Sequence, residues 1–174
     1  LHPRKNLVRL VEAFAMMANV NSYKGDLPKL VIAGQKGWLY EQIFQMVQAL
    51  KLSEQVVFTG YVTADDKPAL LSGALAFVFP SLFEGFGLPV LEAMSCGAPV
   101  LTSNVSSLPE VAGKAALLVN PQDTAQIAAG LRRLATDGNL RHQLVERGFE
   151  QVKSFSWDQA AGQVLTILKK VGRE

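Results

Sequence analysis

Two glutamates separated by seven residues enclose the most unusual segment of this chain, Glu84-Gly-Phe-Gly-Leu-Pro-Val-Leu-Glu92. Two glycines that flank one aromatic residue permit backbone conformations closed to other residues, and they let a ligand approach the main chain. The segment follows Pro80-Ser81 and leads into a predicted helix that begins near Leu88, with Pro89 in its first turn. A helix start offers free N–H groups and the positive end of a dipole, which suits a phosphate or a sugar hydroxyl.

The two carboxylates need a partner other than phosphate, because their charge has the same sign. Glu84 lies at the mouth of the loop, and Glu92 lies about one turn inside the helix. A carboxylate can accept two hydrogen bonds from a vicinal diol, such as that of a ribose or a hexose. The alternative interpretation is a tight strand-to-helix turn with two solvated glutamates. The pattern by itself leaves both open.

Helical segments and short apolar segments alternate along the chain, and these elements must position the loop. Strands are predicted at 29–33, 56–59, 76–79, 99–102 and 116–119, and helices at 6–20, 39–52, 64–72, 88–95, 123–135, 137–153 and 157–171. Continuous apolar strands between helices predict an α/β fold with a Rossmann-like parallel sheet and helices on both faces. Ligands of such sheets bind beyond the carboxyl ends of the strands. Four turns are therefore candidates: the residues before Lys5, Gly34–Gly37, Gly60–Val62 and Pro80–Gly87.

In these features the chain resembles, over nearly its whole length, the C-terminal domain of the GT-B-fold retaining glycosyltransferases of family 4. The positions that match the motif of this family are Glu84, Gly85, Phe86, Gly87, Leu88, Pro89 and Glu92. The resemblance implies that Glu84 bonds the hydroxyl groups of the donor sugar and that Glu92 holds the ribose. It also implies that the N–H groups of Phe86, Gly87 and Leu88 meet the sugar and the β-phosphate.

Further residues receive roles from the same resemblance. The family has a Lys-Asn pair where this chain has Lys5-Asn6, and its lysine neutralises the diphosphate; a solvated helix start is the alternative. The usual arginine falls before Leu1, so Arg4 is a neighbour of that position and receives only a minor role. Gly34 would border the nucleotide, although a structural turn is equally compatible with the pattern.

Two more segments extend the resemblance. The main chain at Tyr61 and Val62 would meet the nucleobase, and Trp38 is predicted to be a packing residue. Ser103 to Glu110 resembles a loop of the family whose Pro-Glu opens a short helix. We expect Ser106 or Ser107 to cap that helix and Glu110 to support it, with a role in the site as the alternative.

Composition excludes several other classes of function. The formal net charge is +2 and no basic stripe appears, so a nucleic-acid partner is not predicted. The single Cys96, predicted to be buried, cannot form an intrachain disulfide, and the two histidines lie far apart in sequence. No Asp-x-Asp motif is present, and we expect neither a metal nor another cofactor. No apolar run reaches about 18 residues, the length of a membrane-spanning helix.

The function that the resemblance implies is that of the donor-binding half of a retaining glycosyltransferase. Segments 30–38, 80–87 and 102–110 look most like mannosyltransferases that use GDP-mannose, with a saccharide or lipid-linked acceptor. A donor of the UDP-glucose type is the alternative. A nucleotide-sugar epimerase and a non-catalytic nucleotide-binding module stay open as other classes, although no evident acid–base pair favours the epimerase.

Two parts of the chain are expected. Residues 1–155 are predicted to form the nucleotide-sugar-binding Rossmann-like domain, and residues 156–174 a C-terminal helix. The apolar face of that helix, Ala161, Val164, Leu165 and Leu168, needs a partner surface, for which the N-terminal domain implied by the resemblance is a candidate. That domain would supply the acceptor site, so we expect the chain alone to be inactive. A cytoplasmic location is predicted, and peripheral attachment to the inner face of the membrane through the absent half is left open.

Overall fold

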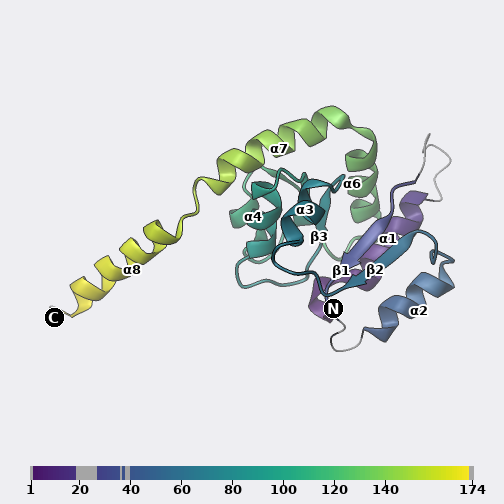
Figure 1. Cartoon of the computed structure of the whole chain (residues 1–174), viewed down its shortest axis with the longest axis horizontal. Helices are drawn as coiled ribbons and strands as arrows, with labels where there is room; N and C mark the ends of the chain where they lie inside the picture. The colour runs from purple at the N-terminus through teal and green to yellow at the C-terminus, as the bar shows by residue number, and fades with distance from the viewer. Residues whose placement is uncertain (1, 19–26, 36, 38–39, 173–174) are drawn as a thin grey trace.

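The computed structural model describes residues 2–18, 27–35, 37 and 40–172, in which strands and helices alternate (Figure 1). The strands are β1 (Leu30–Ala33), β2 (Val56–Gly60), β3 (Phe77–Phe79), β4 (Val100–Ser103) and β5 (Ala116–Val119). The helices are η1 (Pro3–Lys5), α1 (Leu7–Ala18), α2 (Glu41–Ala49), α3 (Lys67–Ser72), α4 (Leu88–Ser95), α5 (Leu108–Ala112), α6 (Thr124–Thr136), α7 (Gly138–Val152) and α8 (Trp157–Val171). The predicted alternation of strands and helices is confirmed.

The start of α3 differs from the prediction by three residues. A turn at Thr63–Asp66 replaces the first predicted helical turn. In it the Asp66 N–H donates to Thr63 Oγ1, and Thr63 Oγ1 donates to the Asp66 carboxylate. Pro68 then lies at the beginning of the helix, where its missing N–H costs nothing. Local side-chain hydrogen bonding thus competes with the helix at this point.

Every strand pair among the described residues is parallel, as predicted. β1 pairs with β2, and β4 pairs with both β3 and β5. The described strands nevertheless form two sheets, β1–β2 and β3–β4–β5, instead of one. β1 and β3 are therefore edge strands.

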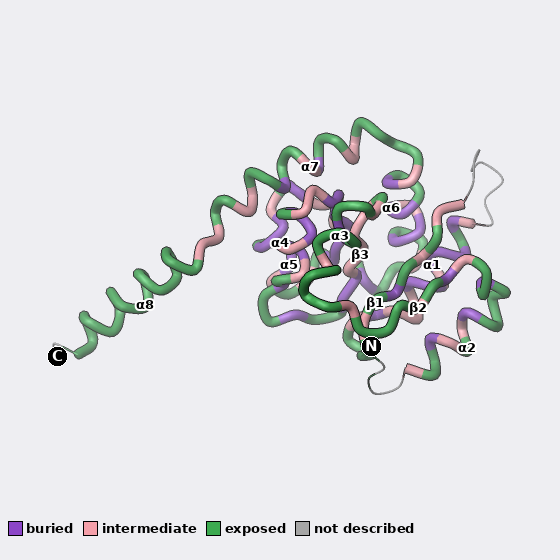
Figure 2. Tube along the Cα trace, in the orientation of Figure 1, coloured by how far each residue is buried: buried purple, intermediate pink, exposed green. Residues whose placement is uncertain are grey.

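Helices cover both faces of the three-stranded sheet. Leu101 and Val119 belong to a core cluster with α1 and α6, whereas Val100 belongs to a second cluster with α4 and α5. Side chains alternate between the two faces of a strand, so one strand can serve both clusters. Figure 2 shows the buried residues on the strands and on the inner sides of these helices. This arrangement confirms the predicted Rossmann-like α/β architecture.

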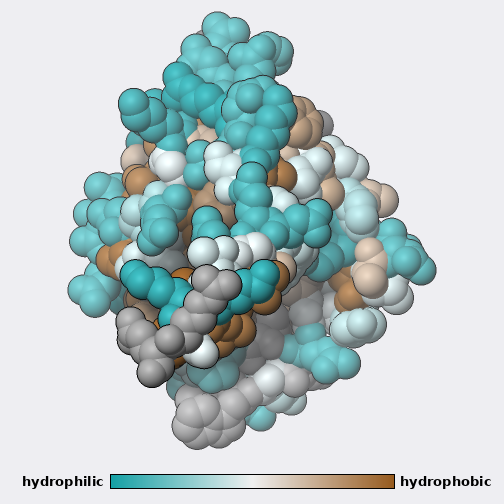
Figure 3. All heavy atoms as spheres, turned by 90° about the vertical axis from the view of Figure 1, so that its left-hand side faces the viewer, coloured by the Kyte–Doolittle hydropathy of each residue, from teal (hydrophilic) through white to brown (hydrophobic). Residues whose placement is uncertain are grey.

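The last helix, α8, extends away from the body of the molecule (Figure 1). None of its residues is buried, and Val164, Leu165 and Leu168 are each more than half exposed. In the view of Figure 3, hydrophobic residues lie at the surface among hydrophilic ones. The division at residue 155 and the partner surface for α8 stay predictions. Among the described residues, no helix has the length and apolar character that a membrane span requires.

Candidate functional site

In the loop between β3 and α4, Gly87 has the special backbone that was predicted, whereas Gly85 has no positive φ and a Cβ atom there would meet nothing within 4 Å. Gly87 has φ +122°, and a Cβ atom there would lie 3.0 Å from Cδ2 of Leu108. Both the conformation and the space therefore require glycine at this position. Gly87 is also the N-cap of α4 and provides no side-chain cap. Among the described residues, no group accepts a hydrogen bond from the N–H groups of Gly85, Phe86, Gly87 and Leu88. The loop thus presents a run of unpaired donors.

Lys5 and Glu84 meet directly at this loop. The distance from Lys5 Nζ to Glu84 Oε1 is 2.7 Å, although the residues are 79 positions apart in sequence. The side chain of Glu84 is only 9% exposed and that of Lys5 is 26% exposed. Lys5 Nζ also lies 4.4 Å from the centre of the Phe79 ring, within the range of a cation–π contact. The structure thus brings together the residue predicted to bind the donor sugar and the residue predicted to neutralise the diphosphate.

Main-chain contacts explain why Lys5 lies there. Asn6 adopts the left-handed conformation (φ 60°) and ends the turn of η1. Its Nδ2 donates to the carbonyl oxygens of Pro80 (3.0 Å) and Pro121 (2.6 Å), which ties the start of α1 to the ends of β3 and β5. The Leu82 N–H donates to the Arg4 carbonyl at 2.8 Å. Arg4 therefore contributes its main chain to the loop, while its side chain is exposed.

Glu92 has a different cationic partner, which the sequence analysis did not identify. Lys67 Nζ, at the start of α3, lies 2.7 Å from Glu92 Oε1, and both side chains are partly exposed (44% and 42%). The two residues are 25 positions apart and share no motif. Only the packing of α3 on α4 brings them together. One oxygen of Glu92 is left to accept a further hydrogen bond.

The turns after β1 and β2 lie next to each other. Gly34 (φ 139°) donates its N–H to the carbonyl of Gly60 (φ 71°) at 2.8 Å. Tyr61 is 68% exposed and Val62 is half-buried, so the segment is accessible to a ligand. Trp38, the predicted packing residue, lies outside the described residues.

The prediction that a serine side chain caps the helix after β4 is wrong. Ser107 occupies the N-cap position of α5 but makes no side-chain cap hydrogen bond. Its hydroxyl instead lies 3.0 Å from the Glu84 carbonyl oxygen and 2.5 Å from the Phe86 carbonyl oxygen. Ser106 Oγ accepts the Glu84 N–H at 3.2 Å. Both serines thus contact the glycine loop, and Ser106 has a positive φ (54°).

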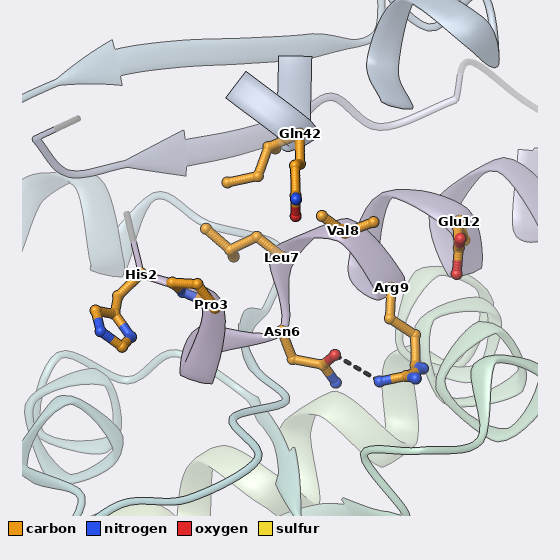
Figure 4. Close-up of a pocket in the computed structure, with 9 residues that line it drawn as sticks. His2, Pro3, Asn6, Leu7, Val8, Arg9, Glu12 and Gln42 are labelled. Carbon is orange, nitrogen blue, oxygen red and sulfur yellow. Dashed lines mark hydrogen bonds between the residues drawn. The ribbon is translucent and has the colours of Figure 1, made fainter. Parts of the chain in front are cut away.

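A hollow of ≈ 260 Å³ lies beside the start of α1 and is lined partly by α2 (Figure 4). Within it Arg9 Nη1 donates to Asn6 Oδ1 at 2.7 Å, and Gln42 reaches from α2 toward Leu7 and Val8. None of the predicted donor-site residues lines it. The Lys5–Glu84 pair and the unpaired N–H groups lie at the glycine loop, and Glu92 lies on the helix that follows it, so we place the candidate site there.

Cysteine and histidine take no part in this site. Cys96 is half-buried at the end of α4, so the prediction that it is buried is wrong. His142 is exposed, with Nδ1 3.7 Å from a carboxylate oxygen of Glu146. Among the described residues, no group of three or more His, Cys, Asp or Glu side chains is arranged to hold a metal ion.

Known proteins share both the sequence and the fold. A sequence model of the family described as "Glycosyl transferases group 1" matches residues 1–151. The O-antigen chain mannosyltransferase B of Escherichia coli is 38% identical over 169 residues, which are 97% of this chain and 44% of that protein. The chain therefore spans less than half the length of this relative.

Two solved structures have the same arrangement of elements. The sucrose-phosphate synthase of Thermosynechococcus elongatus superposes with a TM-score of 0.85 at 29% identity, over 99% of this chain and 43% of that one. The C-terminal domain of a glycosyl transferase group 1 family protein (LpcC) from Francisella tularensis gives 0.76 at 25% identity, over 88% and 80%. Together with the match over residues 1–151, these likenesses show that the chain belongs to the glycosyl transferases group 1 family.

Proposed function

We propose that this chain is the donor-binding half of a retaining glycosyltransferase that transfers a hexose from a nucleotide sugar. The contact between Lys5 and Glu84 carries the proposal. Lys5 is expected to bind the diphosphate and Glu84 the sugar, which are adjacent parts of one donor molecule. The 2.7 Å distance between their side chains fits a single ligand that spans both.

The chemistry of transfer explains the residue types. As the bond from the sugar to the diphosphate breaks, negative charge grows on the leaving group and positive charge on the sugar carbon. Lys5 and the N–H groups of Phe86, Gly87 and Leu88 would offset the negative charge. Removing one preorganised donor from a comparable site costs about 2.7–4 kcal/mol of transition-state stabilisation. Glu84 would hold the sugar hydroxyls, Glu92 the ribose, and the leaving phosphate would assist the acceptor from the same face. The proposal invokes no metal.

The proposed donor is GDP-mannose. Supporting this, the similar protein from Escherichia coli is named an O-antigen chain mannosyltransferase. Gly34, Tyr61 and Val62 would line the nucleotide from the ends of β1 and β2. Titration calorimetry of the chain with GDP, UDP and ADP ranks the bases, and we expect weak binding that favours GDP. A preference for UDP would replace mannose by a donor of the UDP-glucose type, and equal affinity for all three would contradict a donor site.

The remaining half of the reaction would belong to a second domain. The acceptor, a saccharide or a lipid-linked sugar, is proposed to bind an N-terminal domain of the same protein, toward which α8 would cross. The chain alone would then bind donor and catalyse nothing. We further propose a cytoplasmic protein whose contacts with the inner face of the membrane, where its acceptor requires them, lie in that domain.

Two glutamate variants test the division of roles in the longer protein. Glu84→Gln keeps the size of the side chain but loses its charge, so turnover should fall at least about a hundredfold while nucleotide affinity changes little. Glu92→Ala should chiefly weaken nucleotide binding, because it removes the ribose acceptor. Steady-state kinetics and calorimetry measure the two effects.

Glu146→Gln on α7 is the matched control, since Glu146 is 66% exposed and lies outside the site. It should leave both quantities unchanged. Equal turnover in Glu84→Gln and in this control would refute the catalytic role of Glu84.

A further inference from the structure

The segment Ser103–Ser107, which follows β4, holds the glycine loop through its hydroxyl groups. Ser103 Oγ donates to the carbonyl of Ser81 at 2.7 Å. Ser106 Oγ accepts the N–H of Glu84, and the Ser107 hydroxyl reaches the carbonyl of Glu84. Both main-chain polar groups of Glu84 are thereby bound by adjacent serines, while its carboxylate is bound by Lys5. Glu84 is held at three points.

The Ser107 hydroxyl serves two carbonyl groups at once. Its oxygen lies 3.0 Å from Glu84 O and 2.5 Å from Phe86 O, and a hydroxyl has one proton to donate. This proton is shared between the two carbonyls or donated to either. An alanine at position 107 would leave both without this donor. The contact spans 23 positions for Glu84 and 21 for Phe86, so it depends on the tertiary fold.

The planarity of the peptide bond connects these carbonyls to the donors of the loop. In a trans peptide the C=O of one residue and the N–H of the next point in opposite directions. No peptide bond of the described chain is cis. When Ser107 holds the carbonyls of Glu84 and Phe86, the N–H groups of Gly85 and Gly87 must therefore point away from it. These are two of the loop N–H groups that donate no hydrogen bond within the described residues.

We infer that Ser107 is a positioning residue that aims the Gly87 N–H at the β-phosphate of the donor. Ser106 and Ser107 together fix the main chain of Glu84, so that its carboxylate meets the sugar hydroxyls. The inference rests on the proposed donor site and adds to it residues outside the glutamate motif. Neither serine touches the donor, since each acts through the loop.

Affinities for three nucleotides separate this role from a general effect on folding. GMP lacks the β-phosphate, GDP has it, and GDP-mannose adds the sugar. In the 174-residue chain, Ser107→Ala should lower the affinity for GDP about tenfold and leave that for GMP unchanged. Ser106→Ala loses only the acceptor for the Glu84 N–H. Ser106→Ala should reduce the increase in affinity from GDP to GDP-mannose. It should leave the ratio of the GMP affinity to the GDP affinity as in the wild type.

Two further variants control for the loss of a hydroxyl. Ser107→Thr keeps the donor and should restore the GDP affinity to within about threefold of the wild type. Ser72→Ala removes an exposed serine hydroxyl that donates to the Ala69 carbonyl in α3, and it should change none of the affinities. Thermal unfolding of each variant shows whether the body of the protein is intact. If Ser107→Ala does not fold, the predicted behaviour of Ser106→Ala and Ser107→Thr tests the inference.

The outcomes distinguish this inference from the proposed function. Wild-type binding of GDP and GDP-mannose, together with an unchanged ratio of GMP to GDP affinity in Ser107→Ala, would overturn the role of Ser107 and leave the donor site standing. A wild-type chain that binds none of the three nucleotides, and neither UDP nor ADP, would overturn both. Equal weakening of GMP and GDP would assign Ser107 to the fold instead of to the phosphate.

Discussion

At the residue scale, Lys5 pairs with Glu84 and is also the proposed ligand of the donor diphosphate. Its ammonium group neutralises the Glu84 carboxylate, which is 91% buried at the side chain, and it keeps further N–H donors for a phosphate. The Phe79 ring covers the same group at 4.4 Å. Removing one partner of a buried ion pair leaves an uncompensated charge, which destabilises the folded state. We therefore expect the stability of the loop to depend on this one side chain, which is also the side chain proposed to bind the diphosphate.

Lys5→Met should lower the free energy of unfolding by about 1–3 kcal/mol, less than for a fully buried pair because Lys5 is partly exposed. Urea unfolding measures the change. Adding Glu84→Gln to this variant should recover part of the loss, since it removes the unpaired charge.

The pair of Lys153 and Glu150 provides the control, because both side chains are about 70% exposed. Lys153→Met should change the free energy of unfolding by less than about 1 kcal/mol. A Lys5→Met protein as stable as this control would show that the pair with Glu84 contributes nothing to folding.

At the scale of elements, α6 packs unusually close to the three-stranded sheet. Gly130, in the middle of α6, is buried, and a Cβ atom there would lie 2.6 Å from Cδ1 of Leu101 in β4. Leu117 and Val119 of β5 would each be at 3.4 Å. The glycine therefore permits the close contact that buries this face of β4 and β5.

Gly130→Ala should destabilise the protein by about 1–3 kcal/mol through overpacking, although alanine favours a helix by about 1 kcal/mol. In α8, by contrast, a Cβ atom at Gly162 would meet nothing within 4 Å. Gly162→Ala should raise the helix content without lowering the unfolding temperature. Circular dichroism measures both effects, and equal responses of the two variants would contradict the packing argument.

At the scale of the whole molecule, the separation of the described strands into two sheets has a simple explanation. A doubly wound sheet has the strand order 3-2-1-4-5-6. Let β1 and β2 correspond to strands 2 and 3 of this order, and β3, β4 and β5 to strands 4, 5 and 6. Strand 1 of the order then lies between β1 and β3. A strand that preceded η1 in the chain would fit this place. It would also bring the residues before Lys5 to the carboxyl edge where the candidate site lies.

A chain extended at its N-terminus by that strand should unfold at a higher temperature than the 174-residue chain. Its backbone would pair with two strands, so amides of β1 and β3 should exchange with solvent more slowly. Hydrogen exchange measures the protection, with β5 as the internal control because the added strand would not touch it. Unchanged exchange in β1 and β3 would contradict this arrangement.

Much of the architecture follows from local patterns. Apolar periodicity predicted every strand and most helices of the described residues, because burial on one or both faces of an element places apolar residues at a regular spacing. The prediction failed where side chains form their own turns, as at Thr63–Asp66. Resemblance to a known motif identified Lys5, Glu84 and Glu92, and the structure brings the first two together. The roles assigned to them stay predictions.

The sequence by itself determined the α/β class and the glycine loop, and its resemblance to a known motif identified the residues proposed to bind a nucleotide sugar. Only the tertiary structure decided the partners of those residues: Lys67 for Glu92, and Ser106 and Ser107 for the main chain of Glu84. Periodicity and motifs record what each segment requires locally. A hydrogen bond between loops 20 or more positions apart depends on how strands and helices pack. The residue pattern of one segment does not predict such a contact.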